Sequence, residues 1–148
     1  MSIALLDVNA LIALHWRPHI FHQAAMEWFA QNGKGAWATC SLTQAGFARV
    51  LSNPRFDATA PPPAKALELL RASTEANPHH RFWTDTIPLS RISGALRSRI
   101  QGHQQIMDAY LLSLAMHNHG CVATFDTRME ALAPKGSPEH DVLVILRP

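Results

Sequence analysis

The sequence predicts an α/β fold in which a central, mainly parallel five-stranded sheet is covered by helices. Short apolar runs alternate along the chain with longer stretches whose apolar residues recur every three or four positions. This order favours strand–helix–strand units and a parallel sheet. The first run, residues 3–6, is apolar at every position, which is typical of a strand buried on both faces of such a sheet.

Size and composition indicate a single domain over residues 1–148. The chain can bury a sizeable core, and its 47% hydrophobic and 16% charged residues are typical of globular proteins. No apolar run approaches the roughly 20 residues of a membrane span and no secretory leader is present, so we expect a cytoplasmic protein. The net charge of +2 is compatible with a nucleic-acid partner. Cys40 and Cys121 lie in or beside apolar runs and are expected to be buried and reduced.

The N-terminal half is expected to hold two strands and four helices. The strand at 3–6 ends at Asp7, which is a candidate N-cap for the next helix. A proline and an apolar stripe indicate the second helix, which a turn over 32–35 ends. A short apolar run, a serine and then three consecutive prolines indicate the next strand and the starts of two more helices. In order, these elements are expected at 3–6, 8–15, 18–29, 36–40, 42–51 and 64–76.

The C-terminal half is expected to alternate three strands with three helices. Asp85 and Asp126 each follow a short run that reads as a strand. The helix before the fourth strand is apolar over most of its surface and must be largely buried. In order, these elements are expected at 80–83, 90–100, 106–117, 121–125, 127–132 and 142–146.

Three aspartates are placed where a parallel sheet would bring them together. Asp7 and Asp126 follow the first and fourth strands, and Asp108 lies in the first turn of the apolar helix. Singly, each is explained as a helix cap or a first-turn acid. Jointly, carboxylates that converge at the carboxyl edge of a sheet repel one another unless a cation lies between them. Their hard oxygen atoms suit Mg²⁺ or Mn²⁺.

Four motifs in this order carry a resemblance to a known family. They are LLDVN at Asp7, TCSLTQAGFARVLSNP at Gln44, MDAYLL at Asp108 and ATFDTR at Asp126. Together they resemble the PIN domain, and more narrowly the ribonuclease toxins of VapBC toxin–antitoxin systems. The resemblance covers nearly the whole chain and implies a PIN-like three-layer α/β/α sandwich.

The resemblance also implies an activity and a set of site residues. It implies a small Mg²⁺- or Mn²⁺-dependent endoribonuclease, usually a homodimer, which a cognate VapB-like antitoxin holds inactive. Asp7, Asp108 and Asp126 would be the catalytic, metal-binding carboxylates, and Asn9 and Thr124 would orient ligands or the attacking water. A bound ion would lower the pKa of that water, and the hydroxide would attack the scissile phosphorus.

Gln44 departs from the pattern of the family, in which many relatives carry glutamate at this position. A glutamine keeps an oxygen ligand, but it lacks the negative charge and cannot act as a general base. A local explanation is a capping box between Ser41 and Gln44, in which the amide reaches back to the cap's N–H. The alternative function is therefore a PIN-fold module that binds RNA or protein and has lost or weakened catalysis.

Three basic side chains are candidates for binding RNA. Arg49, five residues after Gln44, and Arg128, two residues after Asp126, belong to the second and fourth motifs and can hold phosphates as bidentate donors. His103, just before the Asp108 helix, is a third candidate, although a plain loop histidine explains it as well.

Overall fold

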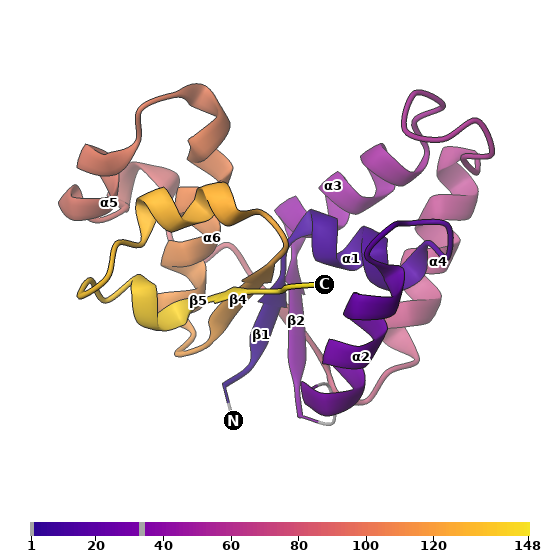
Figure 1. Cartoon of the computed structure of the whole chain (residues 1–148), viewed down its shortest axis with the longest axis horizontal. Coiled ribbons are helices and arrows are strands. Elements are labelled where there is room, and N and C mark those ends of the chain that lie inside the picture. The colour runs from indigo at the N-terminus through magenta and orange to yellow at the C-terminus, as the bar shows by residue number, and fades with distance from the viewer. Residues whose placement is uncertain (1, 33–34) are drawn as a thin grey trace.

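The five predicted strands are present and form one sheet (Figure 1). The structure, a computed structural model, describes residues 2–32 and 35–148, so part of the predicted turn over 32–35 lies outside the described residues. The strand order is β3-β2-β1-β4-β5, and every neighbouring pair is parallel. Each strand end lies within one residue of its predicted position: β1 (Ala4–Leu6), β2 (Trp37–Cys40), β3 (His80–Trp83), β4 (Cys121–Thr124) and β5 (Leu143–Ile145).

Helices cover both faces of the sheet, so the predicted three-layer α/β/α sandwich is confirmed. One face is covered by α1 (Val8–His15), α2 (His22–Asn32), α3 (Ser41–Leu51) and α4 (Pro63–Glu75). The other face is covered by α5 (Gly94–Arg99) and α6 (Ile106–His117). Short 3-10 helices form at Leu89–Arg91, His103–Gln105, Thr127–Leu132 and His140–Val142. Each face has its own buried apolar cluster; Leu5 belongs to one and Leu6 to the other, because successive side chains of a strand point to opposite faces.

The buried helix α6 brings Asp108 to the carboxyl edge of the sheet. Every residue from 109 to 115 is buried, as the apolar sequence predicted. Because α6 leads into the parallel strand β4, it runs back across the sheet and begins at the edge where the strands end. Asp108, in its first turn, therefore lies at the edge where Asp7 and Asp126 follow their strands.

Two predicted helices have wrong bounds. Pro18 does not open α2, which begins at His22, because the preceding residues form two successive turns closed by bonds from His19 N to Trp16 O and from His22 N to His19 O, both 3.0 Å long. The helix predicted over 90–100 is interrupted, because the backbone of Ser93 is extended and its hydroxyl caps a new helix by accepting the Leu96 N–H at 3.1 Å.

A glycine sets how closely α1 and α3 approach. A Cβ atom added to Gly46 would lie 2.5 Å from Cγ2 of Val8, closer than such atoms pack. The contact joins the start of α1 to the middle of α3, and both residues line the cavity described below. The width of this end of the cavity therefore depends on the missing side chain.

Two further sequence predictions concern the thiols and the membrane. Cys40 and Cys121 are both buried free thiols, as predicted. Across 2–32 and 35–148, no helix is long and apolar enough to cross a membrane.

Candidate active site

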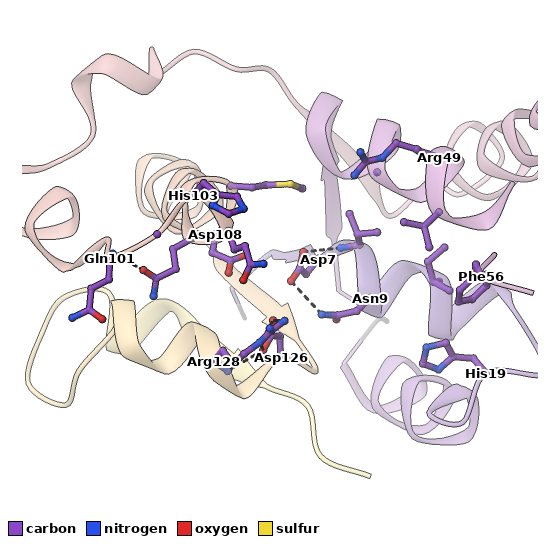
Figure 2. A pocket seen from close by; sticks show the side chains of 18 residues that line it. Asp7, Asn9, His19, Arg49, Phe56, Gln101, His103, Asp108, Asp126 and Arg128 are labelled. Carbon is purple, nitrogen blue, oxygen red and sulfur yellow. Dashed lines mark hydrogen bonds and ion pairs between the residues drawn. The ribbon is translucent and has the colours of Figure 1, made fainter. Parts of the chain in front are cut away.

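The three predicted aspartates line one cavity at the carboxyl edge of the sheet (Figure 2). The cavity has a volume of about 830 Å³ and is lined by Asp7, Asp108 and Asp126 together with residues of α1, α3 and the loop before α6. The predicted convergence of the carboxylates is therefore present in the structure. Their catalytic and metal-binding roles stay predictions.

Asp7 is buried and held by three donors. The residue is 7% exposed. Oδ1 accepts the Val8 N–H at 2.8 Å, while Oδ2 accepts the Thr124 hydroxyl at 2.8 Å and the Asn9 amide at 3.4 Å. Burial raises the pKa of Asp7, the bonds from Thr124 and Val8 oppose that rise, and the charge of Asp126 adds to it. The three donors thus fix the orientation of the Asp7 carboxylate, and none of them carries a positive charge.

Asn9 and Thr124 connect the first and fourth motifs. The Asn9 amide donates to Thr124 Oγ1 at 3.0 Å, and its carbonyl oxygen accepts the Phe125 N–H at 3.0 Å. Thr124 Oγ1 also accepts the N–H of Asp126 at 3.0 Å. These bonds hold the end of β4 against the start of α1, which is the position that an orienting role requires.

The pKa of Asp108 is raised by burial and by the two neighbouring aspartates. The side chain is half-buried on α6, and the pKa is raised from 3.8 to about 6 by burial first, then by the charges of Asp7 and Asp126. Arg128 lowers it only in part. Repulsion among the three carboxylates, expected from the sequence, is therefore present in the structure.

Asp126 is paired with Arg128. The guanidinium group donates from Nε to Oδ1 and from Nη2 to Oδ2, both at 2.9 Å, and this pairing holds the pKa of Asp126 below its usual value. The arginine side chain is 81% exposed, so the pair lies at the mouth of the cavity. The sequence predicted that Arg128 binds an RNA phosphate. In the structure, its guanidinium group is paired with the carboxylate of Asp126.

Gln44 contacts Thr39 rather than the carboxylates. Its amide donates to Thr39 Oγ1 at 2.9 Å, and Gln44 is not among the described residues that line the cavity. The predicted capping box between Ser41 and Gln44 is wrong: helix α3 starts one residue earlier, and the hydroxyl of Thr43 accepts the Cys40 N–H at 2.9 Å instead. Thr43, the third residue of α3, caps the helix in place of Gln44 because its short side chain reaches the Cys40 N–H directly.

The two other basic candidates lie on different sides of the cavity. Arg49 extends from α3, and His103 lies in the loop before α6 (Figure 2). The structure adds lining residues that the sequence did not single out: His19 and Phe56 on the Arg49 side, and Gln101, Gln104 and Gln105 on the His103 side. All of these lie outside the α-helices and strands, where no periodic pattern marks a residue as facing a site.

The carboxylate oxygens of the cavity suit a hard divalent cation, although the described residues form no site with three ligands already in place. The pKa values of Asp7 and Asp108 are raised by burial first and then by the charges of neighbouring carboxylates, and a bound cation would favour the charged form of both side chains. In the part of the chain that the structure describes, no three His, Cys, Asp or Glu side chains are close enough together to hold one ion as they stand. Mg²⁺ commonly binds through one or two carboxylates and keeps several waters, so two of these aspartates suffice.

Comparisons with known proteins identify the family. The family model of the PIN domain matches residues 4–135. Three ribonucleases of Mycobacterium tuberculosis are similar over most of their length: VapC38 is 44% identical over 88% of this chain and 90% of its own, VapC39 39% identical over 92% and 97%, and VapC44 37% identical over 96% and 99%.

A solved structure supports the same fold. It is the crystal structure of VapBC2 from Rickettsia felis bound to a DNA fragment from their promoter, with a TM-score of 0.56. The match covers 98% of this chain and 97% of that chain at 16% identity, which is evidence for the fold alone. From the family model and the extent of the sequence similarity, the chain belongs to the PIN domain family and, within it, to the VapC group.

Proposed function

We propose that the chain is the toxin of a VapBC-type toxin–antitoxin system and acts as a Mg²⁺- or Mn²⁺-dependent endoribonuclease. The observation that carries the proposal is the convergence of three mutually repelling carboxylates in one open cavity. Relatives of 37–44% identity are named ribonucleases, which supports the reaction class.

Within this proposal, the cluster of Asp7, Asp108 and Asp126 would hold the metal ion, and two of the three carboxylates are enough as direct ligands. When bound, the ion supplies a water of lowered pKa and positive charge for the leaving oxygen. Asn9 and Thr124 keep the carboxylate of Asp7 pointed into the cavity through their hydrogen bonds. Arg49, Arg128 and His103 line the same cavity and bind phosphates of the RNA, for which the planar guanidinium groups are well suited.

The substrate and partners follow from the same chemistry and from the family. Single-stranded RNA is the expected substrate, because its bases and phosphates are accessible to a side-chain-lined cavity. A VapB-like antitoxin and a second copy of the chain are the proposed protein partners, and a cytoplasmic location stays a prediction of the sequence.

The alternative, a PIN-fold module that binds RNA or protein without catalysis, depends on Gln44. The amide of Gln44 bonds to Thr39, so the missing carboxylate leaves the contacts of the three aspartates undisturbed. This observation favours the active enzyme.

The proposal is tested by cleavage of a mixed, end-labelled RNA pool with Mg²⁺, with Mn²⁺ and with EDTA. The wild-type protein should cut RNA in either ion and not in EDTA, and Asp7→Asn should not cut. Asp141→Asn is the matched control, because Asp141 is exposed and lies outside the cavity. RNA binding without cleavage under any ion would favour the binding module.

A further inference from the structure

The two ends of the active-site cavity differ in chemistry (Figure 2). The carboxylates lie in the middle. One end is formed by the polar loop over 101–105, with its glutamines and His103. The other end is formed by His19, Arg49 and Phe56, and we call it the aromatic end. A phosphodiester chain lying across the carboxylates would place neighbouring nucleotides at these two ends.

The aromatic end has an apolar floor and an aromatic wall. The floor comes from the facing sides of α1 and α3, with Val8, Ile12, Gly46 and Val50. Phe56 is 36% exposed, and its ring centroid lies 6.4 Å from that of Trp16, with the planes tilted by 54°. The Phe56 N–H donates to Asn53 O at 2.9 Å, so a turn after α3 fixes the residue. The wall therefore presents part of a positioned aromatic ring to the cavity.

His19 adds a second ring whose tautomer is defined. Its Nδ1 accepts the Phe21 N–H at 3.0 Å. Burial, and then the nearby His22, lower the pKa of His19, so near neutral pH the ring is uncharged and carries its hydrogen on Nε2. The ring thus offers a flat face for stacking and one hydrogen-bond donor, and proteins recognise unpaired RNA bases through both kinds of contact.

Arg49 supplies the positive charge of the aromatic end. Its side chain is exposed, and within the described ranges it forms no ion pair with an acidic side chain. By contrast, Arg128 is already paired with Asp126. Arg49 is therefore able to hold a phosphate without first breaking a salt bridge.

We propose that the aromatic end binds one unpaired nucleobase of the RNA, adjacent to the scissile phosphate. The base stacks on Phe56 over the apolar floor, and Arg49 holds the phosphate next to it. An RNA occupant is favoured over a protein side chain because the end is continuous with the carboxylate site, and its free cation complements the phosphates that flank every base. The inference rests on the proposed function, since it assigns a substrate contact to the same cavity.

The test compares cleavage of one single-stranded RNA that the wild type cuts with versions that carry an abasic ribose at each flanking position in turn. One abasic position should lower kcat/KM about tenfold, because stacking of a base on an aromatic side chain is of this strength. Phe56→Ala should lower kcat/KM for the intact RNA to a similar extent and be insensitive to that abasic position, because both changes remove the same contact.

Three further variants separate stacking from packing. Phe56→Trp should restore cleavage, whereas Phe56→Leu, which keeps apolar volume without a ring, should not. Phe82→Ala is the matched control, since Phe82 is 47% exposed on β3 and lies outside the cavity. Full activity of Phe56→Ala, or tolerance of every abasic position, would overturn the inference. So would a Phe56→Ala protein that cuts normally and only escapes inhibition by a VapB-like antitoxin, because the occupant would then be a protein.

A binding measurement keeps this inference separate from the proposed function. In EDTA, a single-stranded oligoribonucleotide with a central 2-aminopurine should lose fluorescence on binding to the wild type, through stacking, and keep it with Phe56→Ala. If no ion supports cleavage but this difference is observed, the proposed nuclease is wrong and the base site is retained. Equal fluorescence with both proteins contradicts the base site whatever the cleavage result.

Discussion

At the scale of single residues, the carboxylate of Asp7 depends on the hydrogen bonds it accepts. It is almost fully buried, and the hydroxyl of Thr124 and the N–H of Val8 are its two shortest donors. A buried acceptor that loses a donor costs about 1–3 kcal/mol. The threonine, which is fully buried on β4, therefore influences both folding stability and the orientation of the acid.

Thr124→Val should lower both stability and activity. The change keeps the shape of the side chain and removes the donor 2.8 Å from Asp7. We expect a loss of about 1–3 kcal/mol in the free energy of unfolding, measured in urea, and a roughly 10- to 100-fold loss in RNA cleavage. Thr59→Val is the control, because it removes a hydroxyl that donates to the exposed Asp57 outside the cavity. Equal losses in the two variants would contradict a specific role for Thr124.

The pKa of Asp108 predicts a pH dependence of stability in the metal-free protein. It is raised from 3.8 to about 6 in the folded state, so between these values the folded protein binds more protons than the unfolded chain. Stability should therefore fall as pH rises from about 4 to about 6. In EDTA, Asp108→Asn should exceed the wild type in stability at pH 7.5 by about 1 kcal/mol, allowing for solvent screening of a half-buried group. At pH 4 the difference should vanish in urea denaturation; an unchanged difference would contradict the repulsion.

At the scale of elements, the contact between α1 and α3 shapes the aromatic end of the cavity. Gly46→Ala would place a Cβ atom 2.5 Å from Val8 Cγ2 and should lower the free energy of unfolding by about 1–3 kcal/mol, the usual cost of overpacking. In the double variant, Val8→Ala should offset part of that loss. Gly94→Ala is the matched control, because its nearest neighbouring atom is 3.7 Å away and no clash is expected. A Gly46→Ala protein as stable as this control would show that the helices separate freely.

The strands were more predictable than the ends of the helices. A strand such as β1 can be predicted from an unbroken apolar run, because both faces of the sheet are buried. The start of α2 depends on the turns before His22, and the start of α5 depends on the hydrogen bond from the Leu96 N–H to the Ser93 hydroxyl. The spacing of apolar residues in the sequence predicts neither. The same reason explains the capping error at α3, where Thr43 and not Gln44 reaches the cap.

At the scale of the whole molecule, the cavity is assembled from segments far apart in the sequence. The three aspartates were predictable because each follows a strand or opens a helix at one edge of a parallel sheet. His19 and Phe56 were not, because they lie in turns whose path only the folded chain defines. Sequence reasoning therefore identified the acidic centre of the cavity and missed its aromatic end.

The central claim is that the three carboxylates act together as one metal-dependent centre. The most direct test is the rate of cleavage of a single end-labelled RNA in Mn²⁺ by Asp7→Asn, by Asp108→Asn and by the double variant, with circular dichroism to confirm folding. Groups that act as a unit are strongly non-additive, so each single variant should lose at least about 100-fold and the double variant should be little worse than either. If a folded Asp7→Asn or Asp108→Asn protein cuts RNA at the wild-type rate, the carboxylate cavity is not the active site.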